Sequence, residues 1–251
     1  MTSQLKISRN IVAAAITAAL SSTALTSTAF AQTAGDNIVS AGWFHIAPQD
    51  SSTPISITSP TPATLTGTGA SVQKTDTFGV SWTHLFTPNW AASLDLGVPP
   101  TYKLNGSGAL APVGQIGEAK QLAPTVLGKY FFGDANTALR PFIGLGVSHV
   151  TYRDIRLTQS FQNTVSAEFS QGPLVAGGTT ASLNSSWAPV YNAGVSYAIN
   201  KDWYASFSVS YLGLKTTADL TTTTNAGVNI LSTTTIKIDP IVTFAAIGYR
   251  F

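Results

Sequence analysis

The chain has 251 residues, of which 44% are hydrophobic and only 10% are charged, whereas soluble domains carry roughly 25% charged residues. Its 13 Lys and Arg nearly balance 11 Asp and Glu, and it contains no cysteine. This composition excludes a strongly basic nucleic-acid-binding protein, a disulfide scaffold, thiolate metal sites and cysteine nucleophiles, and it predicts a surface poorly suited to water.

The N-terminus has the three parts of a secretory signal peptide. Lys6 and Arg9 form a positive segment, residues 11–20 form an apolar run, and Ala-Phe-Ala at 29–31 is a small-x-small cleavage sequence. The apolar run is too short, and too rich in Ala and Thr, for an uncleaved anchor helix. Cleavage makes Gln32 the first mature residue and leaves 11 basic residues against 11 acidic ones, so binding of nucleic acid is not expected.

The mature chain, residues 32–251, has the pattern of an all-β membrane protein. No later segment offers the ~20 consecutive apolar residues of a membrane helix, so only a closed barrel would span a bilayer. The expected strands are residues 37–47, 73–86, 90–98, 119–132, 140–153, 187–199, 203–215 and 232–251.

The connections between these strands alternate in length. The long ones, rich in Gly, Ser, Thr and Pro, are residues 48–72, 99–118, 154–186 and 216–231, and the tight turns are residues 87–89, 133–139 and 200–202. Short periplasmic turns and long extracellular loops are typical of barrels in the bacterial outer membrane. We therefore expect a cleaved signal peptide, residues 1–31, and an eight-stranded antiparallel transmembrane β-barrel in a Gram-negative outer membrane.

Strict alternation assigns the faces of three strands. The lipid-facing and assembly residues expected from it are Trp90, Trp203, Phe207, Tyr211, Ile247, Tyr249 and Phe251. The opposite faces place Asp95, Ser206, Ser208 and Ser210 toward the lumen. Trp90 and Trp203 both follow short turns, which predicts an aromatic girdle at the periplasmic interface. The chain stops on the aromatic Phe251, so the last strand is expected to pair with the first and close the barrel.

The interior is harder to read, because residues 122–132 and 141–147 are apolar on both faces apart from Lys129. A β-sandwich with a dry core is the alternative, but the signal peptide, the closing strand and the loop asymmetry favour a barrel. Eight strands leave room for side chains or one small ligand. Three charges, Asp95, Lys129 and Asp239, are candidates for the lumen, either tuning passage or, as we favour, satisfying one another. Trp187 either constricts the lumen or lies at the membrane interface.

The sequence gives little support for an enzyme. His45, His84 and His149 fall on three different strands without zinc-site spacing, so neither a metal nor a cofactor is expected. A lipid-modifying enzyme would need a nucleophile beside a histidine, but Ser148 and His149 are neighbours along a strand and face opposite ways. We expect no catalytic residues.

Several stretches together resemble the OmpW family of outer-membrane proteins. They are Lys120-Gln121-Leu122-Ala123-Pro124-Thr125, Tyr130-Phe131-Phe132-Gly133-Asp134, Arg140-Pro141 with Gly144-Leu145-Gly146, Ser186-Trp187, and Ile238-Asp239-Pro240 before Gly248-Tyr249-Arg250-Phe251. Their shared order and spacing extend over about residues 37–251. Ala123 replaces the first proline of the family's pair, and residues 212–214 lack the acidic residues that members often carry there.

The resemblance implies a narrow, largely hydrophobic lumen that gives small hydrophobic molecules a passive route, with a sideways exit into the bilayer. The alternative is a structural or interaction barrel with a filled lumen, whose outer loops serve as a receptor surface for phage, toxins or host. The expected partners are outer-membrane lipid, small hydrophobic solutes and, during assembly, periplasmic chaperones and the barrel assembly machinery.

Overall fold

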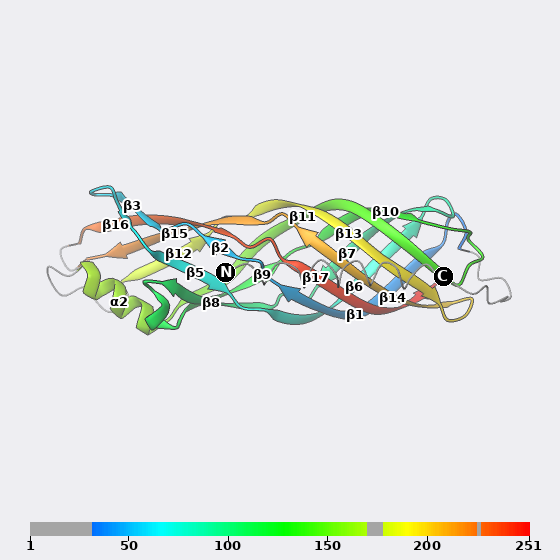
Figure 1. The fold of residues 1–251 in the computed structure, drawn as a ribbon, viewed down its shortest axis with the longest axis horizontal. Coiled ribbons are helices and arrows are strands. Elements are labelled where there is room, and N and C mark those ends of the chain that lie inside the picture. Colours follow the sequence, from blue (N-terminus) through cyan, green and yellow to red (C-terminus); the bar gives the residue numbers. More distant parts are fainter. Residues whose placement is uncertain (1–31, 170–177, 225–226) are drawn as a thin grey trace, which may run out of the picture.

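The computed structural model describes residues 32–169, 178–224 and 227–251. The predicted signal peptide, residues 1–31, lies outside the described residues. The molecule is elongated, with the helix α2 (Gln159–Phe169) at one end and the C-terminus at the other (Figure 1).

One half of the molecule is a closed barrel of eight antiparallel strands, as the alternation predicts. The strands are β1 (Asn37–Ala47), β6 (Thr75–Leu85), β7 (Trp90–Gly97), β10 (Thr125–Phe131), β11 (Leu139–Leu157), β13 (Ser186–Ala198), β14 (Trp203–Leu212) and β17 (Ile241–Arg250). Each pairs with its neighbour in the chain, and β17 also pairs with β1, from Ile38 opposite Arg250 to Ala47 opposite Ile241. This last pairing removes both sheet edges.

Residues expected to form loops instead extend the barrel on its extracellular side, and we call the part that they form the extension. The added elements are β2 (Ser51–Ser52), β3 (Ile55–Ser59), β4 (Ala63–Leu65), β5 (Thr68–Val72), β8 (Thr101–Gly108), the 3-10 helix η1 (Ala111–Val113), β9 (Gln115–Leu122), β12 (Thr179–Leu183), β15 (Lys215–Thr223) and β16 (Asn229–Lys237). β5, β8 and β9 continue the barrel sheet from β11, while β12, β15, β16, β3 and β4 form a second sheet, with β2 beside β16. The long connections between the barrel strands therefore contain strands of their own, because these segments also have an inner face to bury.

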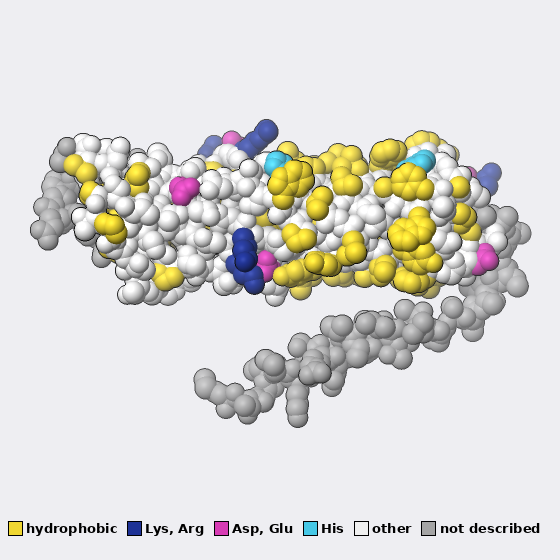
Figure 2. Space-filling model, turned by 90° about the horizontal axis from the view of Figure 1, so that it is seen from above, with side chains coloured by type: hydrophobic (Ala, Val, Ile, Leu, Met, Phe, Trp, Pro, Cys, Tyr) yellow, Lys and Arg dark blue, Asp and Glu magenta, His cyan; other side chains and the backbone are white. Residues whose placement is uncertain are grey.

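On the face seen in Figure 2, exposed apolar side chains gather in a band over the barrel half, whereas only scattered ones lie over the other half. Along β11 the outward residues Ile143, Leu145 and Val147 are exposed, whereas the inward Phe142 and Ser148 are buried. This arrangement reverses the usual order of a soluble sheet and is the one expected for strands surrounded by hydrocarbon.

Aromatic rings border the band at both rims. Trp90 with Tyr130, and Trp203 with Tyr249, pack at the rim near the short turns, with centroids 4.9 and 5.3 Å apart. At the opposite rim His149 packs on Trp187 at 4.6 Å, and the rings of Tyr191 and Tyr211 lie 6.4 Å apart. Such girdles mark the two membrane interfaces.

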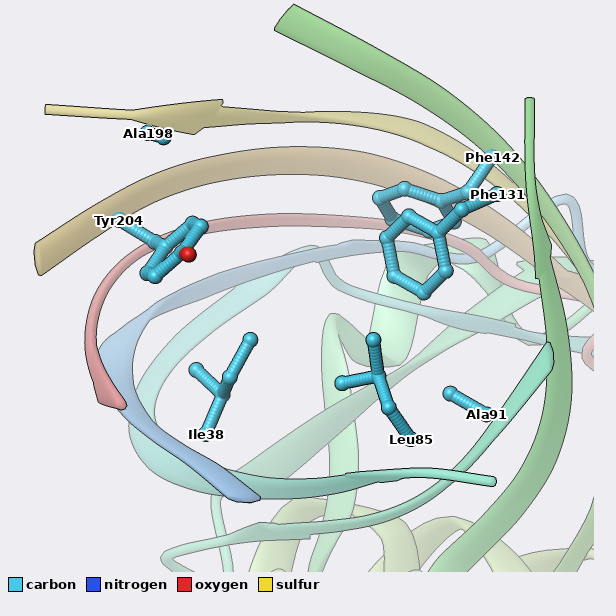
Figure 3. Packing of buried hydrophobic residues seen from close by; sticks show 7 residues of the cluster. All are labelled: Ile38, Leu85, Ala91, Phe131, Phe142, Ala198 and Tyr204. Carbon is cyan, nitrogen blue, oxygen red and sulfur yellow. The ribbon is translucent and has the colours of Figure 1, made fainter. Parts of the chain in front are cut away.

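Inside the barrel, the periplasmic end is filled by a hydrophobic cluster. Its members converge from the barrel strands and the adjoining residues (Figure 3): Ile38, Leu85, Ala91, Phe131, Phe142, Ala198 and Tyr204.

The close approach of neighbouring strands in the barrel wall depends on small residues. A Cβ added at Gly146 of β11 would collide with the backbone carbonyl of Val126 on β10.

Candidate functional site: an axial line of cavities

A line of cavities begins at the extracellular end of the extension. The first has a volume of about 350 Å³ and is lined in part by Ile55, Leu110 and Phe161 of α2. The second, about 70 Å³, shares these three residues with the first. The two cavities are therefore contiguous, and the aromatic ring of Phe161 lies where they meet.

The second cavity is almost wholly apolar. Inward faces of β8, β9, β15 and β16 provide Leu104, Ile116, Leu220 and Ile236 to its wall. Strand alternation turns the polar neighbours of these residues outward, so a strip such as Thr216-Thr217-Ala218-Asp219-Leu220 buries its Ala and Leu and exposes its Asp. Hydrocarbon-like lining with few polar groups suits an apolar ligand.

A small gap of about 20 Å³ continues the line toward the membrane. It shares Leu104 with the cavity above and Tyr102 with the cavity below. Burial raises the pKa of Tyr152, which also lines the gap, to about 12, and burial raises the pKa of Tyr102 well above its ordinary value. Both phenols are therefore uncharged at neutral pH, and the gap carries no ionised hydroxyl.

The fourth cavity, about 90 Å³, lies in the outer half of the barrel. Its walls include Phe44, Asp95 and Ser210. The Asp95 carboxylate accepts a 2.5 Å hydrogen bond from Ser81 Oγ, and Ser210 Oγ accepts one of 2.8 Å from Asn192 Nδ2. These two polar side chains are thus hydrogen-bonded to neighbouring side chains, which reduces the cost of facing an apolar molecule.

Below the fourth cavity the lumen is blocked. Phe44 on β1 and Phe244 on β17 lie directly opposite each other on neighbouring strands, and their rings stack with centroids 4.0 Å apart on the inner wall. Leu127 packs with Val190 and Leu212, which also line the fourth cavity. A separate polar pocket of about 40 Å³ follows, and the hydrophobic cluster of Figure 3 fills the end.

The periplasmic end is also tied by a buried cation. Arg140 donates from Nη1 to Gln32 Oε1 at 2.6 Å and to the carbonyl of Pro88 at 2.7 Å, and from Nη2 to the carbonyl of Phe131 at 3.4 Å. One side chain thus joins the N-terminal segment to two periplasmic turns. Sequence reasoning did not single out Arg140, although its place just after a tight turn was visible.

The structure places five of the seven residues proposed to face the lumen inside the barrel. Asp95 and Ser210 line the fourth cavity, whereas Lys129, Ser206 and Ser208 line the polar pocket below the block. The Lys129 ammonium lies 5.3 Å from the centroid of the Phe142 ring. Among the described residues Lys129 forms no direct salt bridge, so it does not contact Asp95, although the Asp95 carboxylate still acts on it electrostatically.

Trp187 does not face the lumen, and that prediction was wrong. Its side chain is 70% exposed and packs on His149 at the extracellular rim, whereas the next residue, Ala188, is fully buried. Trp187 shares the outward face of β13 with Tyr191. The alternative reading, an interface tryptophan, matches this position.

The placement of Asp239 in the lumen was also wrong. Its carboxylate is buried, but it forms a 2.9 Å ion pair with Lys237 and a hydrogen bond with Tyr211, whose side chains are both exposed on the outer surface. A residue between two strands is not constrained by alternation, and the backbone here has a positive φ of 37°. Asp239 is therefore part of the extracellular rim.

The residues proposed to face lipid lie on the exterior. All seven side chains are exposed, with Phe251 at 68% the most exposed: Trp90, Trp203, Phe207, Tyr211, Ile247, Tyr249 and Phe251.

We searched the described residues for a metal site and for a catalytic nucleophile–base pair. No group of three His, Asp or Glu side chains within the described residues is arranged to hold a metal ion. Ser148 is buried and His149 faces outward, so they form no nucleophile–base pair. Nor does the described part of the chain contain a helix with the length and hydropathy to cross a membrane.

Other residues of the site lay outside the sequence prediction. Tyr102, Leu104 and Phe161 all fall in segments that had been expected to form loops. The alternation of Tyr102 and Leu104 with Thr101 and Lys103 was a usable signal for two of them.

Comparison with known proteins agrees with this architecture. The model of the OmpW family matches residues 33–251. Outer membrane protein W of Vibrio cholerae serotype O1 is 33% identical over 218 residues, which cover 86% of this chain and 89% of that protein. The dibenzothiophene metabolism operon protein PahQ of Pseudomonas aeruginosa is 27% identical over 171 residues, or 67% of this chain and 68% of that one.

A solved structure supports the same assignment. The crystal structure of the outer membrane protein OprG from Pseudomonas aeruginosa superimposes with a TM-score of 0.76 at 27% identity, covering 89% of this chain and 99% of that one. The eight-stranded barrel, the membrane band and the family match over residues 33–251 lead to one conclusion: the chain belongs to the OmpW family of Gram-negative outer-membrane barrels, which are not enzymes.

Proposed function

We propose that this outer-membrane barrel gives small hydrophobic molecules a passive route from the extracellular side into the membrane. The observation that carries the proposal is the line of four cavities, in which each shares lining residues with the next. The line runs from the mouth beside α2 to the outer half of the barrel and stops at the stacked rings of Phe44 and Phe244.

The lining decides the class of solute. A polar solute moving through the second cavity would lose its water without finding hydrogen-bond partners, which costs several kcal/mol. An apolar solute instead gains from leaving water, by about 25 cal/mol per Å² of its buried surface. The relative PahQ supports this class, because its name associates it with the metabolism of dibenzothiophene, an apolar aromatic compound.

The exit we propose is sideways, through the wall between β6 and β7–β8. The backbone of Gln73 donates to Lys103 above this point, and the next backbone bond toward the membrane joins Val98 to Phe78. Between them lie Pro99 and Pro100, which have no N–H to contribute to a ladder. The fourth cavity borders this seam through Thr77, Gly97 and Pro100, so a small separation of the wall would connect it to lipid.

The proposal is tested by uptake into lipid vesicles that contain the refolded protein. Ala119, buried and lining both the second cavity and the gap, is replaced in Ala119→Phe, which fills the route. Ala245→Phe adds the same side chain on the lipid-facing wall and is the matched control. A naphthalene-sized fluorescent hydrocarbon and glucose are the two probes.

We expect hydrocarbon uptake to exceed that of protein-free vesicles, to fall severalfold in Ala119→Phe and to persist in Ala245→Phe, with no uptake of glucose. Hydrocarbon uptake no faster than without protein would contradict the proposal. The receptor role of the outer loops would then be the remaining candidate. Equal loss of uptake in both variants would also count against the axial route.

A further inference from the structure

The outer wall carries a cluster of charged side chains directly above the extracellular aromatic girdle. We name it the basic patch. It consists of Lys103 on β8, Glu118 and Lys120 on β9, and Arg153, Asp154 and Arg156 on β11.

Strand register gathers these residues into two adjacent rows. In the lower row Lys120 lies opposite Arg153 on one side and Thr101 on the other. In the upper row Glu118 lies between Lys103 and Arg156. Directly opposite residues on one face of a sheet lie about 5 Å apart, so the cluster is compact.

A β-bulge concentrates the charges of β11 on the outside. The register shifts between Arg153 and Arg156, and Asp154 has a positive φ of 50°. An extra residue in one strand interrupts the alternation of side chains. As a result Arg153, Asp154 and Arg156 are all exposed, while Ile155 contributes to the second cavity within.

The patch retains unpaired positive charge. Lys120 forms a 2.8 Å ion pair with Asp154. Four cations against two carboxylates leave a net charge of +2. No ion pair among the described residues involves Lys103, Arg153 or Arg156.

The height of the patch corresponds to the lipid headgroups. His149, in the aromatic girdle, precedes Arg153 by four residues of the same strand, or about 13 Å. Lys and Arg side chains are seen beside the end of the apolar band that faces the extension (Figure 2). A guanidinium at this level can donate two parallel hydrogen bonds to one phosphate.

We propose that the basic patch binds the phosphate groups of a phosphorylated glycolipid in the outer leaflet, with Arg153 and Arg156 as the main donors. The exposed, unpaired guanidinium groups face the headgroup layer, and Lys103 and Lys120 supply further charge. The exposed side chains of the patch lie on the outer wall, although Glu118 and Arg156 also contribute to the lining of the second cavity. The proposed binding does not depend on transport through the cavities.

The test measures binding of a bis-phosphorylated glucosamine-disaccharide lipid to the folded protein in detergent by native mass spectrometry. Arg153→Gln with Arg156→Gln removes the two donors. Lys201→Gln with Lys215→Gln removes the same charge from exposed positions outside the patch. We expect affinity to fall about twenty-five-fold in the first variant, at a factor of about five per cation, and to stay unchanged in the second.

Two further measurements separate the sources of phosphate and the kind of contact. The dephosphorylated lipid is expected not to bind, and inorganic phosphate alone is expected to bind far more weakly than the lipid. Arg153→Lys with Arg156→Lys keeps the charge but loses the planar fork, so we expect an intermediate affinity. Equal binding of the dephosphorylated lipid, equal binding of inorganic phosphate, or an unchanged Gln variant would each overturn the proposal.

Discussion

Arg140 and Gln32, 108 residues apart in the chain, are joined by a 2.6 Å hydrogen bond and are both buried at the periplasmic end of the barrel. Gln32 is also the residue at which the mature chain is predicted to begin. This bond joins the segment that precedes β1 to the beginning of β11, the longest strand.

Replacing Arg140 is expected to destabilise the barrel. Arg140→Met leaves the carbonyls of Pro88 and Phe131 without their charged donor, and we expect the free energy of unfolding to fall by about 3 kcal/mol. Urea unfolding in lipid vesicles, followed by tryptophan fluorescence, measures the change. Arg153→Met, at an exposed position, is the control and is expected to alter stability by less than about 0.5 kcal/mol. Equal effects of the two substitutions would contradict this role of Arg140.

Gly146 is expected to tolerate no side chain. In Gly146→Ala the new Cβ meets the backbone of Val126, so β10 and β11 would have to separate at the point where they close the sheet. We expect a loss of about 2 kcal/mol. Gly128→Ala on β10 is the control, since the nearest atom to its Cβ is the Leu145 carbonyl at 3.8 Å. The folded fraction on unheated gels reports both, and an intact Gly146→Ala barrel would show that the wall yields more readily than we argue.

The C-terminal ring is expected to act in assembly more than in stability. Phe251 is 68% exposed, and its backbone N–H donates to Asn37 while its carbonyl accepts from Asn37, bonds that Phe251→Ser retains. We propose that periplasmic chaperones and the assembly machinery bind this ring, so the variant should accumulate in the periplasm. Cell fractionation measures this, with Phe132→Ser, another exposed aromatic position, as the control. Normal insertion of Phe251→Ser would refute the proposal.

Asp154 is expected to titrate at unusually low pH. A hydrogen bond from Lys120, together with its charge, holds the pKa of this carboxyl below its usual range. Because the folded-state pKa is depressed, the contribution of the pair is present above the unfolded value of about 3.9 and is lost as pH falls through the lower folded value. Carboxyl NMR titration should find the pKa raised in Lys120→Met and unchanged in Lys237→Met. A pKa that does not respond to Lys120→Met would exclude the pair.

The membrane half could be predicted from the sequence because lipid imposes a simple rule. Along β14, every second residue from Trp203 to Tyr211 faces hydrocarbon, and the residues between them face the lumen without interrupting this alternation. Trp187 was misplaced because it begins its strand, although extending the alternation back from Tyr191 would have placed it outside. Asp239 was misplaced because a charge next to the membrane was assumed to need the lumen, when Lys237 neutralises it outside.

The extension was missed for a different reason. In β15 the inward residues Thr216, Ala218 and Leu220 alternate with polar ones, but the many threonines on both faces resemble a loop. Water bathes the outside of this part, so its outer face needs no apolar residues, and the apolar residues of its inner face are interspersed with threonine. Its inner face becomes apparent only when β15 and β16 are seen around the second cavity.

The 19 residues of β11 form one unbroken strand from the periplasmic turn to the extension. At about 3.3 Å per residue this strand is some 60 Å long, twice the thickness of a hydrocarbon core. The mouth of the cavity line consequently stands outside the hydrocarbon core. An apolar compound would thus enter the protein on the watery side of the membrane, and antibodies that bind whole cells would reach this tip rather than the membrane band.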